Sequence, residues 1–218
     1  MVLAIFDLDE TLIATDSDHA WGEFVADKGL VDAEHHRHIN QAFFADYKRG
    51  TLDIDAYMRF SCSVLAQHDM DVLRSLRAEF LAEYIKPMLL PKAISLVESH
   101  REKGDCLVVV TATIEFITSP IVEYFGIKHL IAPTPEIRDG RYTGEIVGIP
   151  SFKEGKVIRI KEWLSEHDQS LEGSFCYSDS KNDLPMLELV DNPHVVDPDP
   201  ELLRIAKERA WPVLTLRG

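Results

Sequence analysis

Two carboxylates follow the first apolar run of the chain at a spacing that suits catalysis. Residues 2–6 form a short continuous apolar run typical of a buried parallel strand, and Asp7 and Asp9 come directly after it. Because side chains alternate along an extended chain, Asp7 and Asp9 would point the same way while Leu8 turns toward the core. Two carboxylates in one small space raise each other's pKa, so we expect a divalent metal, a proton or both between them.

Polar side chains also follow two later apolar runs of the same kind. Thr111 follows one run, Asp179 and Asp183 follow another, and Lys156 opens a predicted helix. The carboxyl ends of parallel strands meet at one edge of a sheet, so these groups would gather with the first two carboxylates. Carboxylate oxygens suit Mg²⁺, while the hydroxyl of Thr111 and the ammonium of Lys156 would hold phosphoryl oxygens. The set predicts phosphoryl transfer.

The elements that must position these residues can be read from the spacing of apolar residues. From residue 91 onward strands and helices alternate, which predicts an α/β fold with a Rossmann-like, doubly wound parallel sheet. The expected strands are 2–6, 106–110, 129–132, 174–178, 194–196 and 213–216, and the expected helices are 91–103, 116–125, 153–166, 184–189 and 201–209. The turn dipeptides Asp139-Gly140 and Thr143-Gly144 predict a small hairpin. Residues 16–86 show only helical spacing, so we expect a core of residues 1–15 and 87–218 with an inserted all-helical cap of residues 16–86.

Composition narrows the classes of function. The chain has 218 residues, 45% of them hydrophobic, and a formal net charge of -14, which argues against binding to nucleic acid or anionic membranes. Its three cysteines, Cys62, Cys106 and Cys176, form no CxxC pair and are expected as buried thiols in a reducing cytoplasm. No run approaches ~18 apolar residues, and an acidic motif stands near the N-terminus, where a signal peptide would need a cationic start, so we expect a cytoplasmic protein. The dinucleotide fingerprint GxGxxG is absent.

Four of these positions, in this order, make the sequence resemble the haloacid dehalogenase superfamily of phosphatases. The matching segments are Asp7-Leu8-Asp9-Glu10-Thr11 for the first motif, Thr111 for the second, Lys156 for the third and Asp179-Ser180-Lys181-Asn182-Asp183 for the fourth. The helical insertion between the first two motifs resembles the cap of the subfamily that contains phosphoserine phosphatase. The resemblance covers the whole chain and implies a Mg²⁺-dependent phosphatase that works through an aspartyl-phosphate.

The resemblance also implies a role for each matching residue. Asp7 would be the nucleophile, and Asp9, its pKa raised by Asp7 and the bound phosphate, would protonate the leaving alcohol and then accept a proton from water. Mg²⁺ would be held by Asp7, the main-chain carbonyl of Asp9, and Asp179, with Asp183 acting through water or on Lys156. The phosphate-binding residues would be Thr111, Ala112, Lys156 and Asn182.

Structural alternatives exist for each of these residues. Asp7, Asp9 and Thr111 are also residues that cap helices or form turns. Asp179 and Asp183 also suit the N-terminal turn of a helix, where the dipole favours negative charge. Lys153 lies one helical turn before Lys156 and competes for the same role.

The choice of substrate rests on positions in the cap and on departures from the subfamily's pattern. Asp16 falls where phosphoserine phosphatases place an acidic residue for the substrate amine, and Arg59 falls near their carboxylate-binding arginine. The second motif reads Thr111-Ala112-Thr113 where these enzymes typically have Ser-Gly-Gly, so added side chains would crowd a small ligand.

These departures weaken phosphoserine as the substrate. Histidinol phosphate, an amino alcohol ester without a carboxylate, is favoured, with Asp16, Asp18 and Glu115 as negative partners for its amine and imidazole. Phosphoserine phosphatase and a phosphotransferase that passes the phosphoryl group to a second alcohol remain alternatives. A noncatalytic phosphate-binding module would lack the nucleophile or the carboxylates of the fourth motif, and this chain has both.

Overall fold

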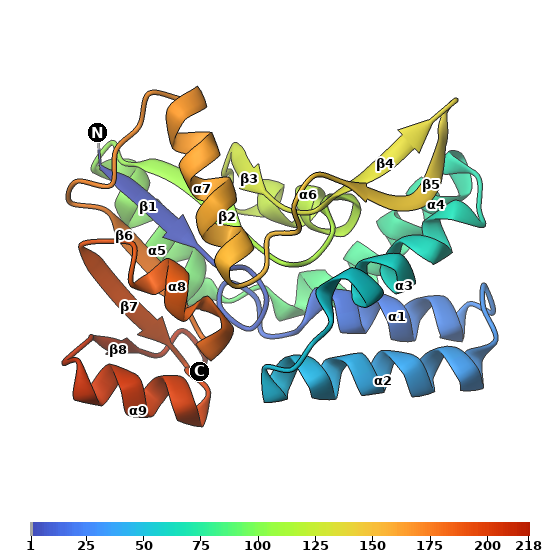
Figure 1. Cartoon of the computed structure of the whole chain (residues 1–218), viewed down its shortest axis with the longest axis horizontal. Helices are drawn as coiled ribbons and strands as arrows, with labels where there is room; N and C mark the ends of the chain where they lie inside the picture. The colour runs from blue at the N-terminus through green and yellow to red at the C-terminus, as the bar shows by residue number, and fades with distance from the viewer. Residues whose placement is uncertain (1) are drawn as a thin grey trace.

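One parallel sheet organises the computed structural model, which describes residues 2–218 (Figure 1). Its six strands follow the order β3-β2-β1-β6-β7-β8, and every neighbouring pair is parallel, which confirms the predicted doubly wound fold. These strands are β1 Leu3–Phe6, β2 Cys106–Val110, β3 His129–Ile131, β6 Phe175–Ser178, β7 Asn192–Val196 and β8 Val213–Leu214.

Helices cover both faces of the sheet because successive strand residues alternate between two apolar clusters. Ala4 and Phe6 of β1 belong to one cluster and Leu3 and Ile5 to the other. The first cluster takes in α5 (Pro91–Glu102) and α6 (Glu115–Tyr124). The second takes in α7 (Glu154–Glu166), α8 (Leu184–Leu187) and α9 (Pro200–Glu208). Burial on both faces explains why the strands read as continuous apolar runs in the sequence.

The segment between β1 and α5 is helical, as predicted. It contains α1 (Ser17–Asp27), α2 (Ala33–Arg49), α3 (Ile54–Ala66) and α4 (Met70–Phe80), followed by a π-helical turn at Leu81–Ile85 and a 3₁₀ turn at Lys86–Met88. The two chain crossings between this segment and the sheet lie side by side, since Ile13 and Leu89 form an isolated antiparallel bridge. A cap with limits at residues 16 and 86 stays a prediction.

The predicted hairpin is present and packs on the helical segment. Strands β4 (Thr134–Arg138) and β5 (Arg141–Val147) pair antiparallel, and β5 lies against α3 (Figure 1). Asp139 and Gly140 both have positive φ, of 50° and 76°, as a tight two-residue turn of type I′ requires. Gly144 lies inside β5 and not in a turn, and a Cβ there would lie 3.5 Å from the Ala66 side chain.

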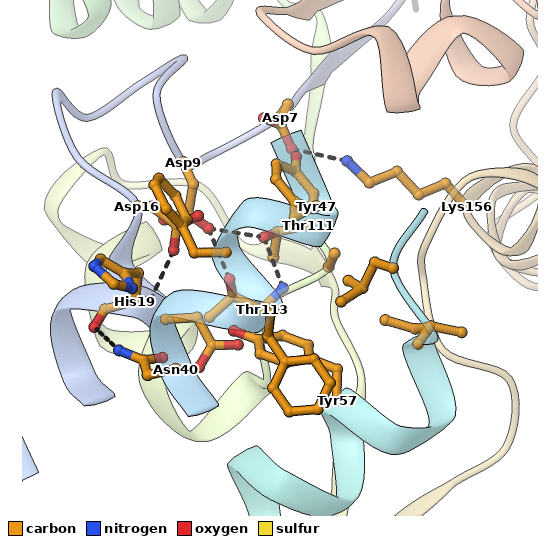
Figure 2. A pocket seen from close by; sticks show the side chains of 16 residues that line it. Asp7, Asp9, Asp16, His19, Asn40, Tyr47, Tyr57, Thr111, Thr113 and Lys156 are labelled. Carbon is orange, nitrogen blue, oxygen red and sulfur yellow. Dashed lines mark hydrogen bonds and ion pairs between the residues drawn. The ribbon is translucent and has the colours of Figure 1, made fainter. Parts of the chain in front are cut away.

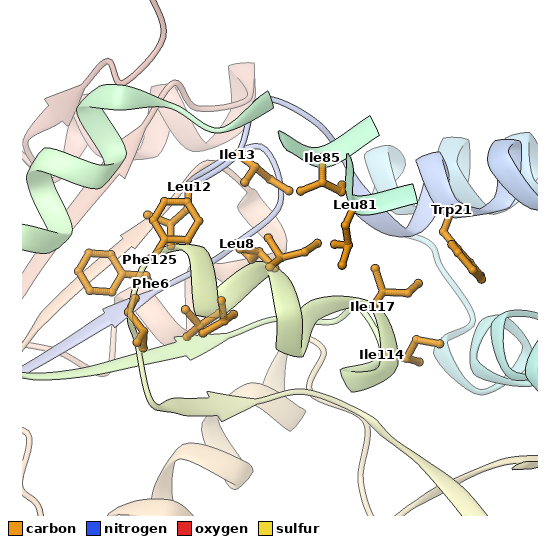
Figure 3. Packing of buried hydrophobic residues seen from close by; sticks show 14 of the residues in the cluster. Phe6, Leu8, Leu12, Ile13, Trp21, Leu81, Ile85, Ile114, Ile117 and Phe125 are labelled. Atoms are coloured by element: carbon orange, nitrogen blue, oxygen red, sulfur yellow. The ribbon is translucent and has the colours of Figure 1, made fainter. Parts of the chain in front are cut away.

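An apolar cluster joins the helical segment to the sheet (Figure 3). Leu8, Leu12 and Ile13, which follow β1, pack in the same cluster as Leu81 and Ile85 from the end of the helical segment. All five side chains are buried. Leu8 stands between Asp7 and Asp9 in the sequence. Burial of its side chain therefore fixes the backbone that carries both carboxylates.

Two of the three cysteines match the expectation of burial. Cys62 and Cys176 are buried and Cys106 is half-buried, and all three are free thiols. Within residues 2–218, every helix is too short or too polar to cross a membrane.

Candidate active site

The ends of β1, β2 and β6 bring the predicted site residues to one edge of the sheet. Phe6 pairs with Val109 of β2 and with Tyr177 of β6, so the residues that follow these three positions lie side by side. The N–H of Asp7 continues the ladder by donating to the Tyr177 carbonyl at 2.9 Å. Asp7, Thr111 and Asp179 therefore come together because each stands just past the end of a paired strand.

Lys156 lies between two carboxylates in the interior of this site. Its side chain is 2% exposed, and its Nζ lies 2.8 Å from Asp7 Oδ1 and 2.7 Å from Asp183 Oδ1. The hydroxyl of Ser178 also donates to Asp183, at 2.7 Å. Lys153, the competitor one turn earlier, instead donates to the carbonyl of Gly50 at 2.8 Å. The geometry therefore supports Lys156 as the lysine of the third motif.

A close approach of backbone places the helix that carries Lys156. A Cβ at Gly155 would lie 2.2 Å from the carbonyl oxygen of Pro150, so only glycine fits there. Gly155 is buried in the first turn of α7, directly before Lys156. Gly155 therefore allows the first turn of α7 to lie against the loop at Pro150. In the sequence, the Gly-Lys pair at residues 155 and 156 indicated this position.

Asp7 and Asp179 are bridged by the hydroxyl of Thr11. Thr11 Oγ1 lies 3.2 Å from Asp7 Oδ2 and 3.0 Å from Asp179 Oδ1, and it accepts the Asp179 N–H at 3.1 Å. Thr11 is fully buried. The sequence placed it in the first motif without giving it this function.

The charges of the site call for a cation in addition to Lys156. Three buried carboxylates, Asp7, Asp179 and Asp183, surround one ammonium group. Burial raises the pKa of Asp7 to about 7 despite the lowering effect of Lys156. Burial first, and then the charges of Asp7 and Asp183, raise the pKa of Asp179 well above its usual range. A cation between Asp7 and Asp179 would relieve this repulsion.

The donors fit Mg²⁺. In residues 2–218, no three His, Cys, Asp or Glu side chains converge as an all-side-chain metal site. Mg²⁺ is usually bound through one or two carboxylates together with waters. Two carboxylates and one main-chain carbonyl, the set implied by the family resemblance, therefore suit this ion.

Asp9 turns its side chain toward a different set of partners. Its Oδ1 accepts the Ser17 N–H at 2.7 Å, and its Oδ2 accepts the Thr113 hydroxyl at 2.8 Å and lies 3.4 Å from Thr111 Oγ1. Burial first, and Asp16 second, raise the pKa of Asp9 to about 6. Asp7 and the bound phosphate were expected to raise this pKa, whereas burial and Asp16 have the largest effects in the structure.

Asp7 and Asp9 nevertheless line one pocket of about 530 Å³, its open mouth included (Figure 2). Thr111, Ala112 and Lys156 line it beside the two carboxylates, as predicted for a phosphate-binding end. The pocket lies between the sheet edge and helices α1, α2 and α3, whose side chains form the rest of its wall.

The rest of the pocket wall is acidic and aromatic. Asp16 and Asp18 line it, as predicted, together with the aromatic side chains Phe43, Phe44, Tyr47 and Tyr57. Asp16 caps α1 by accepting the His19 N–H at 2.8 Å, and burial raises the pKa of Asp16. Lys156 is the only lysine or arginine among the described residues that line this pocket.

Three residues predicted to bind substrate or phosphate lie outside the pocket. Arg59 is exposed, because α3 turns Met58, Ser61 and Cys62 inward and leaves position 59 on its outer face. Glu115 is exposed at the start of α6 and accepts a hydrogen bond from Thr134 at 3.1 Å. Asn182 is buried, but its amide donates to the Tyr47 carbonyl at 3.0 Å and contacts the end of α2. The structure does not bring Arg59, Glu115 and Asn182 to the pocket with the other predicted residues, and their roles stay predictions.

The aromatic wall was not predicted. Phe43, Phe44 and Tyr47 stand close together on α2, a helix that is otherwise mostly polar. An apolar group on a polar helix was the available signal, but helical spacing alone does not distinguish a ligand pocket from a core. Thr113 was noted as a crowding residue, whereas in the structure its hydroxyl holds Asp9.

Comparisons with known proteins agree with this arrangement. Residues 4–188 match the family described as haloacid dehalogenase-like hydrolase. The chain is 48% identical to a histidinol-phosphatase from Neisseria meningitidis serogroup C (strain 8013), over 99% of both chains. It is 43% identical to a protein of unknown function from Bordetella pertussis Tohama I, with a TM-score of 0.93, covering 99% of this chain and 98% of that one. A substrate-bound phosphoserine phosphatase shares the fold at 16% identity, with a TM-score of 0.72, covering 99% of this chain and 93% of that one.

Proposed function

Because the chain belongs to the haloacid dehalogenase-like hydrolase family and is a phosphoric monoester hydrolase, we propose that its substrate is histidinol phosphate. The observation that carries this proposal is the composition of the pocket. Lys156, the one lysine among its described lining residues, is already paired with Asp7 and Asp183, while Asp16 and Asp18 line the same pocket without a lysine or arginine partner. Such a pocket favours an ester with a cationic tail.

The same composition disfavours phosphoserine. A substrate carboxylate would repel Asp16 and Asp18 in their ionised forms, and Lys156, the one lysine or arginine among the described lining residues, is already paired. The arginine expected to bind such a carboxylate, Arg59, is exposed and outside the pocket. The aromatic wall suits a flat ring, which histidinol phosphate has and phosphoserine lacks. The relative named histidinol-phosphatase, at 48% identity, supports the same choice.

We propose that Asp7 attacks phosphorus. A bond forms between one Asp7 oxygen and phosphorus while the bond from phosphorus to the substrate oxygen breaks, which leaves an aspartyl-phosphate. Asp9 lines the same pocket and has a pKa raised to about 6, so it holds a proton often enough near neutral pH to give it to the leaving alcohol. The ionised Asp9 then takes a proton from the water that attacks phosphorus and releases phosphate.

Positive charge and hydroxyl groups around Asp7 would stabilise the transferring group. Lys156, which contacts Asp7, and Thr111 at the end of β2 would bind phosphoryl oxygens. We propose that the carboxylates of Asp7 and Asp179 and the main-chain carbonyl of Asp9 hold Mg²⁺, which would neutralise charge on those oxygens. Asp183 would position Lys156, to which it is paired.

Several wider predictions accompany this function. The helical segment would act as a cap over the pocket, which it lines with residues of α1, α2 and α3. A cytoplasmic location is supported by three free thiols, and the net charge of -14 supports a protein that does not bind nucleic acid.

A substrate screen tests the proposal. Phosphate release should be fastest with histidinol phosphate, slower with phosphoserine, and dependent on Mg²⁺. Turnover of phosphoserine at the higher kcat/KM would refute the choice of substrate. The same reaction run with added acceptor alcohols separates a phosphatase from a phosphotransferase, since only a transferase would yield new phosphate esters.

A further inference from the structure

Asp18 is a buried carboxylate at the wall of the pocket and forms no ion pair. Its side chain belongs to the first turn of α1 and is 5% exposed. Both of its oxygens lie 3.5 Å from the hydroxyl of Ser61, and the hydroxyl of Tyr57 is close enough to lower its pKa. In the described part of the chain, no Lys, Arg or His side chain lies within 4.0 Å of it.

Burial disfavours the ionised form of Asp18 unless a ligand places a positive charge beside it. Burial first, and then the charges of Asp16 and Asp9, raise the pKa of Asp18 to about 8, although hydrogen bonds from Tyr57 and Ser61 oppose this. Burying a carboxylate without a cationic partner is unfavourable in any protein. Asp18 lines the substrate pocket and is contacted by hydroxyl groups of α3. Its carboxylate is therefore already oriented to bind a cationic group of the substrate.

The three acidic side chains on this side of the pocket form a series that starts at the phosphate end. Asp16 lies beside Asp9, since the N–H of Ser17, the next residue, donates to Asp9 at 2.7 Å (Figure 2). Asp18 lies two residues farther along α1 and contacts Ser61 of α3. In histidinol phosphate the amine is close to the phosphate ester and the imidazole ring is farther away. This order matches the amine to Asp16 and the ring to Asp18.

The surroundings of Asp18 fit a flat ring. Tyr57 and Phe43 line the pocket with their ring centroids 5.3 Å apart and their planes at 63°. Ile54 and Leu52 add apolar surface beside them. Aromatic and aliphatic side chains beside the Asp18 carboxylate suit a planar ring that carries a proton on nitrogen.

Resting on the proposed function, we propose that Asp18 determines specificity by accepting a hydrogen bond from a protonated ring nitrogen of the substrate. Tyr57 and Ser61 act as positioning residues that hold the Asp18 carboxylate toward the ring. Asp18 would then recognise the ring, and Asp16 would recognise the amine.

The test compares two esters that share an amine and differ in the ring. Histidinol phosphate carries the imidazole and phosphoethanolamine does not. The ratio of their kcat/KM values should fall by roughly 10- to 100-fold in Asp18→Asn, because a charge-assisted hydrogen bond is lost only with the first ester. The matched control is Asp71→Asn, whose side chain is 95% exposed and outside the pocket, and its ratio should equal that of the wild type.

A binding measurement gives a readout that does not depend on turnover. Calorimetry with histidinol, the dephosphorylated product, should show a Kd that rises by roughly 10- to 100-fold in Asp18→Asn. Tyr57→Phe keeps the ring and removes only the hydroxyl group, and its Kd should rise by roughly 2- to 10-fold. This second variant tests the proposal if Asp18→Asn does not fold.

The outcomes are distinguishable. A selectivity ratio and a histidinol Kd that both stay within about threefold of the wild type in Asp18→Asn would overturn the assignment of Asp18 and leave the proposed function standing. A wild-type enzyme that does not hydrolyse histidinol phosphate would overturn both.

Discussion

Replacing Lys156 by methionine should lower the free energy of unfolding by about 3–5 kcal/mol at about pH 8 in metal-free buffer. The lysine is 2% exposed and contacts Asp7 and Asp183 at 2.8 and 2.7 Å, so the variant leaves both carboxylates buried without their cation. Methionine keeps the length and the apolar stem of the side chain, which confines the change to the ammonium group. A chain of this size should lose roughly 6–20 °C in Tm.

The pH dependence of this loss gives a second readout. Burial raises the pKa of Asp7 to about 7 even beside Lys156. Protonation of Asp7 at lower pH removes one of the negative charges that Lys156 offsets, so the loss in Lys156→Met should shrink as pH falls toward about 5.

The matched control is Lys153→Met. Lys153 is half-buried, and its ammonium group donates to a neutral carbonyl, that of Gly50, so the expected loss is below ~1.5 kcal/mol. Urea unfolding followed by circular dichroism measures both variants. A Lys156→Met protein within about 1 kcal/mol of the wild type, or less affected than Lys153→Met, would refute the assignment of Lys156 as the buried counter-ion.

Three other perturbations should have defined outcomes. Asp7→Asn should reduce phosphate release by at least ~10⁴-fold with an unchanged circular dichroism spectrum, and comparable turnover would mean that another group attacks phosphorus. Because the pKa of Asp18 rises from 3.8 to about 8 on folding, the folded protein binds more protons between these values, and its free energy of unfolding should fall as pH rises through them. Asp18→Asn should flatten that slope in urea titrations at about pH 5 and about pH 8, and an unchanged slope would contradict the assignment. Gly155→Ala places a Cβ 2.2 Å from the Pro150 carbonyl oxygen and should cost roughly 1–3 kcal/mol, so an unchanged urea midpoint would show that this contact is relaxed.

The catalytic edge of the sheet was predictable because strand ends are determined by local patterns. A continuous apolar run identifies a buried strand, and the residue after the run is then placed by sheet geometry alone. Asp7, Thr111 and Asp179 follow this rule, and the structure brings them together. The hairpin turn at Asp139 and Gly140 was similarly readable, since both residues tolerate positive φ.

The substrate end was harder to predict because it depends on which face each helix turns inward. Arg59 and Tyr57 are two residues apart on α3, and a small error in helix orientation exchanges an exposed residue for a pocket residue. Glu115 was expected as a negative partner for the substrate, but it begins α6 and its carboxylate accepts a hydrogen bond from Thr134. No pattern in a single sequence reports such tertiary orientations.

The packing of β5 on α3 determines which segments of this enzyme can be exchanged as a unit. The two partners are separated in the sequence by residues 67–140, which include α4, α5, α6, β2 and β3. Tyr142 and Ile146 of the hairpin nevertheless pack in the same apolar cluster as residues of α3. Transplanting the specificity of this enzyme onto another phosphatase would therefore require two grafts, one for residues 17–80 and one for residues 134–147. A chimera that received only the first graft would leave one side of α3 bare, and its failure would say nothing about the pocket itself.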